Sequence, residues 1–193
     1  MRAHVLALVP GLVLASLTAT PASAVPPFDG DAAWTYLEKQ LEFGPRAPGT
    51  PGHAACAEWM VQTLEPKADV VRTHVFMFDD PYSDQRLQLT NVIASFRPEL
   101  EPRVALAAHW DTRPRADRDS ASVAHLPIPG ANDGGSGTAV LLALADVFAE
   151  NPPPVGVDLL LFDGEDWGEE GDSQYYLLGS RRFVQDHPRY RPQ

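Results

Sequence analysis

The chain has 193 residues, enough for one domain with a sizeable core and too few for two ordinary domains. Its 26 Asp and Glu residues outnumber its 15 Lys and Arg residues, which gives a net charge of -11. Because nucleic acids and anionic membrane surfaces repel such a chain, its composition argues against either as a partner.

The first residues differ in kind from the rest. A mostly apolar run from Val5 to Leu17 follows Arg2, and Ala22-Ser23-Ala24 has the A-x-A pattern of a cleavage site. We therefore expect residues 1–24 to be a signal peptide and residues 25–193 to form one domain that is exported, to the periplasm or beyond. The apolar run is shorter than the ~20 residues that cross a bilayer, and no later stretch could cross one, so no membrane span is expected after signal removal.

Two helices are predicted before the first strand. The first is capped by Asp29 or Asp31 and runs to Leu41, because its apolar residues recur at helical spacing. The second follows a turn-forming segment and runs from His53 to about Leu64.

Strands and a helical crossover are predicted in the remainder. Segments 70–78 and 87–96 alternate in polarity, are rich in β-branched and aromatic residues, and are expected to pair as a hairpin. The other elements expected are, in order, a buried strand at 104–108, a long polar loop at 112–125, a glycine-rich turn at 130–137 that opens a helix ending before Asn151, a strand at 157–162 and a helix at 176–185. The strand, helix and strand from 104 to 162 form a β-α-β unit, which implies a parallel pairing.

Three carboxylates follow the strand at 157–162. Asp163, Glu165 and Asp166 come after an apolar run that predicts burial on both faces. Ligands bind at this end of the strands in open α/β sheets, and several desolvated anions there need a cation or strong donors. Neighbouring Glu165 and Asp166 must point apart, so one can hold a metal while the other faces the reacting water or amine. An acidic surface loop is the alternative interpretation.

Further donors are expected at the same edge of the sheet. His109 and Asp111 follow the strand at 104–108, and Asp133 opens the helix after the glycine-rich turn. Cys56 is the only cysteine, so a thiolate site is excluded, and the remaining oxygen and imidazole donors suit zinc in an open, catalytic geometry. Taken alone, Asp133 could be a helix cap and His109 an ordinary strand-end histidine; the combination favours the metal.

The glycine-rich run at 130–138 does not fit two other motifs. It lacks the lysine of a phosphate-binding loop, and Asp133 would repel a phosphate. Thr138 stands where G-x-S-x-G requires its last glycine, so Ser136 is not expected to be a nucleophile.

In their order and spacing, four motifs resemble the M28 family of zinc peptidases. They are His109-x-Asp111, Gly130-Ala131-Asn132-Asp133, Phe162-Asp163-Gly164-Glu165-Asp166 and Leu178-Gly179-Ser180-Arg181. The resemblance runs from about Asp31 to Val184. Within the family it is closest to the glutaminyl-peptide cyclotransferase branch, including its bacterial members, because Asp166 is followed directly by Trp167.

The resemblance implies a three-layer α/β/α sandwich around a mixed, mainly parallel sheet that is incomplete at the C-terminus. It implies that Asp133 and Asp166 are zinc ligands and that Glu165 is the general acid and base. His109 would be a ligand in a two-zinc aminopeptidase and would lie beside the site in a one-zinc cyclase. The family also often has a cis peptide bond after the position of Asp133.

Two aromatic residues stand next to these candidate ligands. Trp110 and Trp167 would line an apolar substrate pocket, although an aromatic side chain at a strand end is more often simply packed.

The sequence departs from the family at its end. The histidine that completes the family's zinc site lies far downstream, and neither His187 nor any other remaining histidine matches it. The chain therefore resembles a family member that lacks its C-terminal part.

The sequence is compatible with three functions. The first is a zinc-dependent glutaminyl cyclase, an acyltransferase that converts the N-terminal Gln of peptides or proteins to pyroglutamate and releases ammonia. The second is a secreted zinc aminopeptidase, in which Glu165 would activate a metal-bound water. The third is a non-catalytic, truncated remnant of the family.

Overall fold

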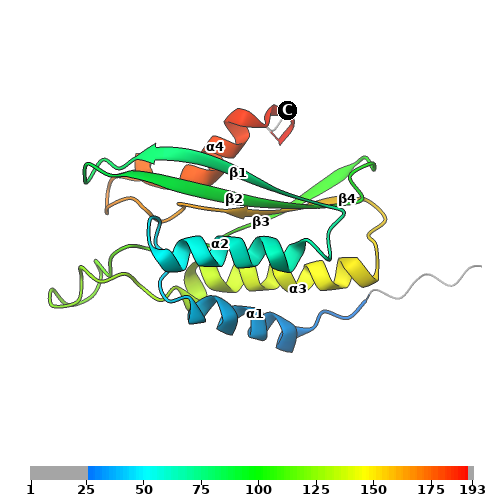
Figure 1. The fold of residues 1–193 in the computed structure, drawn as a ribbon, viewed down its shortest axis with the longest axis horizontal. Coiled ribbons are helices and arrows are strands. Elements are labelled where there is room, and N and C mark those ends of the chain that lie inside the picture. Colours follow the sequence, from blue (N-terminus) through cyan, green and yellow to red (C-terminus); the bar gives the residue numbers. More distant parts are fainter. Residues whose placement is uncertain (1–25, 191–193) are drawn as a thin grey trace, which may run out of the picture.

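The computed structural model of the chain describes residues 26–190, so the signal peptide expected at residues 1–24 lies outside the described residues. Four strands form one sheet in the order β1-β2-β4-β3 (Figure 1). They are β1 (Val70–Asp79), β2 (Arg86–Phe96), β3 (Arg103–His109) and β4 (Gly156–Phe162). No helix among the described residues is long and apolar enough to span a bilayer.

The sheet is mixed, as predicted, but antiparallel pairing predominates in it. β2 pairs antiparallel with both β1 and β4, and only β3 and β4 are parallel. The expectation of a mainly parallel sheet was therefore wrong for the described residues. The physical reason is connectivity: a parallel pair needs a long crossover, and between these strands the chain has one helical crossover, whereas β1 and β2 are joined by a short turn.

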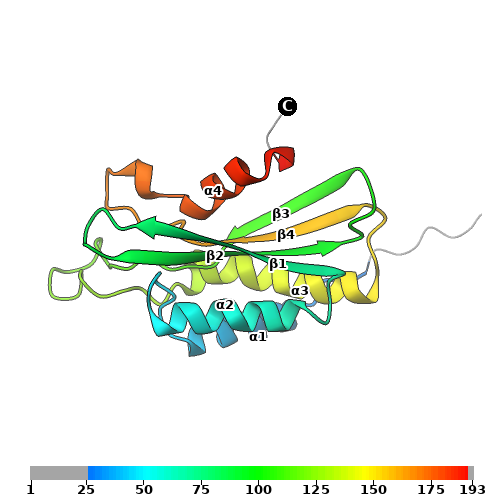
Figure 2. The ribbon, with the colours of Figure 1, turned by 45° about the horizontal axis from the view of Figure 1, so that its top comes forward.

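Helices cover both faces of the sheet, which confirms the three-layer α/β/α sandwich. α1 (Gly30–Glu42), α2 (Pro51–Leu64) and α3 (Gly137–Glu150) lie on one side, and α4 (Leu178–Asp186) lies on the other (Figures 1 and 2). The hairpin and the β3-α3-β4 crossover are both present as expected.

Side-chain caps explain where the first two helices begin. The Asp29 carboxylate accepts hydrogen bonds from the N–H groups of Asp31 and Ala32, which confirms the predicted cap of α1. α2 begins at Pro51, before the predicted His53, because the Thr50 hydroxyl accepts the N–H of His53 and proline suits the first helical turn.

The β4 strand divides the core into two. Its residues from Gly156 to Leu161 are all buried, as the apolar run predicted. Leu159 and Leu161 belong to the larger cluster with α2 and α3, whereas Leu160 packs with Ile93 and Phe183 beneath α4. The period of two along the strand thus supplies an apolar surface to both helical layers.

Candidate metal centre

The parallel β3-β4 pair brings two strand ends to one edge of the sheet. His109, the last residue of β3, is in register with Phe162, the last residue of β4, and the N–H of Trp110 continues the ladder to the carbonyl of Phe162 at 3.0 Å. The segments that follow carry Asp111 on one side and Glu165 on the other. The convergence predicted from the sequence is therefore present.

The Asp111 carboxylate ties these two segments together. It is fully buried and accepts hydrogen bonds from the backbone N–H groups of Glu165 at 3.0 Å and Asp166 at 3.2 Å. Its Oδ1 atom also lies 3.4 Å from Nδ1 of His109. Because one rigid carboxylate contacts both segments, the orientation of His109 is linked to the backbone that carries the acids.

A tight turn before α3 places Asp133 at the same edge. The turn, η1 (Ala131–Ser136), contains Gly134 with φ +81°, and a Cβ there would lie 2.3 Å from the carbonyl oxygen of Asp111. The close approach of two backbones therefore requires glycine at this position. Asp133 Oδ1 lies 3.0 Å from Nε2 of His109.

The same turn is held from inside by a buried arginine. Arg46 is fully buried and donates to three carbonyl oxygens: Trp110 at 2.9 Å, Pro129 at 3.1 Å and Gly130 at 2.7 Å. Its guanidinium thus joins the end of β3 to the turn that carries Asp133. Every one of these acceptors is a backbone group, so Arg46 positions the chain and does not itself pair with the nearby carboxylates.

The acids around His109 control its charge. Burial alone would lower the pKa of His109, but Asp111, Glu165 and Asp133 outweigh it and raise the pKa to about 9. The Nδ1 atom is buried and makes no well-directed hydrogen bond, although Asp111 Oδ1 lies 3.4 Å away. The imidazole therefore lies among negative charges with part of its bonding capacity unused.

Glu165 has the environment expected of a general base. Burial raises the pKa of its carboxyl group, as do Asp111, Asp166 and Asp133, while His109 lowers it. The side chain is still 32% exposed, and Oε2 lies 4.0 Å from Nδ1 of His109. A carboxylate with a raised pKa and open access is suited to accept a proton and return it.

An arginine from the long loop after β3 contacts Asp166. Nη1 of Arg113 lies 2.8 Å from Asp166 Oδ1 and also donates to the hydroxyl of Tyr176, while Asp117 binds the other side of the guanidinium. Burial raises the pKa of Asp166, and Arg113 partly offsets this by favouring the charged form. The composition of this loop predicts only a polar segment, and no local pattern in it indicates the contact with Asp166.

These donors fit zinc in kind and in location, but they do not form a complete site. Among residues 26–190, no three His, Cys, Asp or Glu side chains are grouped so that they could hold a metal ion. Asp133 instead contacts His109, and Asp166 contacts Arg113. Two oxygen donors of the right chemistry are thus present, each with a protein partner that a cation would have to displace or share.

The structure corrects the interpretation of Trp110. Its side chain is fully buried, donates to the carbonyl of Thr90 at 3.1 Å and stacks on His53 at 4.5 Å, so it cannot contact a substrate. Trp167 is 8% exposed and donates to Asp80 Oδ1 at 2.9 Å. The alternative of simple packing therefore describes both indoles better.

A cavity of about 320 Å³ opens beside the candidate ligands. It is lined by His109, Asp133 and the turn around them, and the other predicted site residues are not part of its wall. The cis peptide bond expected after Asp133 is absent, because the one cis bond among the described residues precedes Pro102.

Fold and site together define an α/β/α domain that presents a histidine and several carboxylates at the carboxyl ends of two parallel strands. The profile described as "Peptidase family M28" matches residues 91–192, just over half of the chain. The chain belongs to this family, as the resemblance implied.

Three relatives illustrate the range of activities in its neighbourhood. A glutaminyl-peptide cyclotransferase of Drosophila melanogaster is 29% identical over 145 residues, covering 72% of this chain and 38% of that protein. The structure of Porphyromonas gingivalis glutaminyl cyclase has a TM-score of 0.79 and 38% identity, covering 83% of this chain and 56% of that one. A Zn-dependent exopeptidase from Parabacteroides distasonis ATCC 8503 has a TM-score of 0.79 and 36% identity, covering 88% and 59%.

Relatives that are named for zinc support zinc as the metal of this family. The chain spans between about two fifths and three fifths of the length of these relatives.

Proposed function

We propose that this protein is a zinc-dependent glutaminyl cyclase, with Glu165 as its general base and acid. The observation that carries the proposal is the position of Glu165, a partly exposed carboxyl with a raised pKa at the edge where Asp133 and Asp166 also lie. The likeness to glutaminyl cyclases at 38% identity supports the same chemistry.

The reaction requires one proton carrier. The α-amine nitrogen of an N-terminal glutamine attacks the δ-carbon of its own side chain, forming a C–N bond and closing the five-membered ring of pyroglutamate. Glu165 takes a proton from the attacking amine and delivers it to the departing nitrogen, which leaves as ammonia. A carboxyl group whose pKa is raised by burial and by neighbouring acids suits both steps.

Asp133 and Asp166 are the residues that would hold zinc, and His109 would join them if a second ion is bound. A bound zinc ion supplies Lewis-acid polarisation of the amide carbonyl. Asp111 supports this arrangement by fixing the backbone of Glu165 and Asp166. Arg113 holds one carboxylate oxygen of Asp166 and leaves the other available.

The substrates in this proposal are the N-termini of peptides or proteins outside the cytoplasm. The predicted signal peptide supports export, and the acidic composition disfavours nucleic acid.

An aminopeptidase is the second candidate. The similarity to a Zn-dependent exopeptidase favours it, because the same carboxylate could activate water against the first peptide bond. The two reactions share Glu165, so the site geometry alone suits either one.

Two substrates distinguish the cyclase from the aminopeptidase. The purified protein, supplied with zinc, is incubated with Gln-β-naphthylamide and with Leu-p-nitroanilide. Cyclisation of the first without hydrolysis of the second, abolished by a chelator, is the result expected for a cyclase. Hydrolysis of the leucine substrate would establish the aminopeptidase, and turnover of neither would identify a non-catalytic family member.

A further inference from the structure

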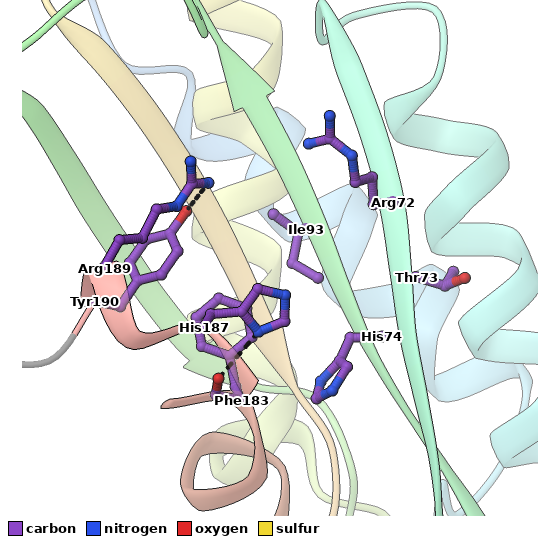
Figure 3. Close-up of a pocket in the computed structure, with 8 residues that line it drawn as sticks. All are labelled: Arg72, Thr73, His74, Ile93, Phe183, His187, Arg189 and Tyr190. Atoms are coloured by element: carbon purple, nitrogen blue, oxygen red, sulfur yellow. Dashed lines mark hydrogen bonds between the residues drawn. The ribbon is translucent and has the colours of Figure 1, made fainter. Parts of the chain in front are cut away.

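A second cavity lies on the α4 side of the sheet. It has a volume of about 340 Å³ and is enclosed by the face of β1, by Ile93 of β2 and by the segment formed from α4 and η3 (Pro188–Tyr190) (Figure 3). This volume falls within the ~300–1,000 Å³ typical of small-molecule sites. Its walls carry Arg72 and His74 from β1 and His187, Arg189 and Tyr190 from the end of the chain's described part.

The charge of this cavity is opposite to that of the whole chain. Four lining residues are basic or can become so, namely Arg72, His74, His187 and Arg189, and none is an acid. In a chain with a net charge of -11, this concentration of positive groups is a local exception. An anion entering the cavity would meet attraction where most of the surface repels it.

Arg72 and Arg189 keep their charge available. Within residues 26–190 neither forms an ion pair with an acid, whereas Arg103 and Arg182 are paired with Asp158 and Asp186. Arg189 donates to the hydroxyl of Tyr190 at 2.8 Å. Figure 3 shows that Arg72 and Arg189 come from different walls of the cavity, Arg72 from β1 and Arg189 from η3, with Ile93 of β2 between these walls.

Two carboxylates lie near the cavity, and both already have cationic partners. Asp158 accepts a hydrogen bond from the hydroxyl of Tyr190 at 2.8 Å and is paired with Arg103 at 2.6 Å. Asp186 contacts His74 at 3.0 Å, but it also accepts a hydrogen bond from Arg182 at 2.7 Å. Its negative charge is therefore already shared by two cationic partners, and it leaves the Arg72 and Arg189 side of the cavity positive.

The floor of the cavity is apolar. Ile93 is 7% exposed and Phe183 is 1% exposed. The ring of His187 stacks on Phe183 with centroids 4.3 Å apart and is anchored by a hydrogen bond between its Nδ1 and the carbonyl of Phe183. A ligand that extends below the guanidinium groups would contact carbon atoms and an immobilised ring.

We propose that this cavity binds a small organic anion, a phosphate or carboxylate that carries an apolar group. The anionic head lies between Arg72 and Arg189, because guanidinium groups bind such oxygens through paired hydrogen bonds. The apolar part packs on Ile93 and His187. This site is independent of the proposed catalysis at Glu165.

Calorimetric titration with phenyl phosphate and with benzoate tests the proposal on the whole chain. Saturable one-to-one binding of at least one probe is expected, and inorganic phosphate should bind more weakly because it leaves the apolar floor empty. Arg72→Gln should weaken binding of that probe about tenfold, the usual effect of losing a hydrogen bond to a charged group.

Arg118→Gln is the matched control. Arg118 is 81% exposed and pairs with Glu170 away from the cavity, so this variant removes the same charge without removing a lining residue. Arg72 is itself exposed, and an unchanged melting temperature will show that its variant is folded. The proposal is overturned if neither probe binds saturably, if inorganic phosphate binds as tightly, or if both variants weaken binding equally.

Discussion

The imidazole of His53 is paired with the Asp163 carboxylate inside the core, with Nε2 2.9 Å from both carboxylate oxygens. Both side chains are buried, and the backbone N–H of Thr90 donates to the same carboxylate. Burial raises the pKa of Asp163, and His53 and the Thr90 N–H act in the opposite direction. The first of the three acids after β4 is therefore structural, and it fixes the start of the segment that carries Glu165.

Replacing His53 with alanine should destabilise the protein by about 3 kcal/mol, because it leaves the Asp163 carboxylate buried and without its main partner. His125→Ala is the control, since His125 is exposed. Urea unfolding of both variants measures the difference. Equal stability of the two would show that the buried pair contributes nothing to the fold.

A Cβ at position 134 should disturb the turn that holds Asp133. Gly134→Ala combines a left-handed backbone with a contact of 2.3 Å to the Asp111 carbonyl oxygen, whereas Gly171→Ala has φ +88° and open space around its Cβ. Gly171→Ala should cost about 1 kcal/mol from backbone strain alone. Thermal unfolding should show a clearly larger loss for Gly134→Ala; similar losses would mean that the close approach of the two backbones is unimportant.

Acid should weaken the buried ion pair between Arg103 of β3 and Asp158 of β4. Burial alone would raise the pKa of Asp158, but Arg103, Ser95 and Tyr190 overcome this and hold it below its usual range. The folded-state pKa is thus lower than the unfolded one, so the stabilisation is present above the unfolded pKa of about 4 and is lost as the pH falls through the folded value.

The variant Asp158→Asn isolates this contribution. At pH 7 it should be less stable than the parent by about 3 kcal/mol, because Arg103 keeps its charge without its partner. The difference in stability between the parent and the variant should become smaller as the pH falls toward 3. Glu99→Gln, which breaks an exposed pair with Arg97, should show little change at any pH; a gap for Asp158→Asn that is independent of pH would contradict the assignment.

Local patterns were sufficient to predict most of the fold. The alternation in β1 and β2, the apolar run of β4 and the Asp29 cap of α1 are properties of neighbouring residues, and each element appears within a few residues of its predicted bounds. The balance of parallel and antiparallel pairing depends on which strands lie side by side. No pattern of neighbouring residues predicts that β2 lies next to β4. The expectation of a mainly parallel sheet was therefore wrong.

The sequence predicted that the site lies at one edge of the sheet, but it did not predict the contacts of the individual residues. Strand ends and a glycine-rich turn indicated that His109, Asp133 and Glu165 would meet, and His109 does contact both acids. The partners of these residues come from distant segments: Arg113 contacts Asp166 across 53 positions in the sequence. Whether Trp110 faces a ligand or the core likewise depends on His53, a residue of another element.

The proposal that Glu165 is the base of a glutaminyl cyclase is tested most directly with a peptide that begins with glutamine. The peptide is incubated with the protein and zinc, and the release of ammonia and the mass of the product are measured. The parent protein should convert the peptide to its pyroglutamyl form, and Glu165→Gln should be slower by about a hundredfold or more, since it cannot carry the proton. Glu58→Gln, at an exposed position on α2, should match the parent. Equal rates for the parent and Glu165→Gln, or no ammonia from the parent, would contradict the assignment of Glu165 as the base of a glutaminyl cyclase.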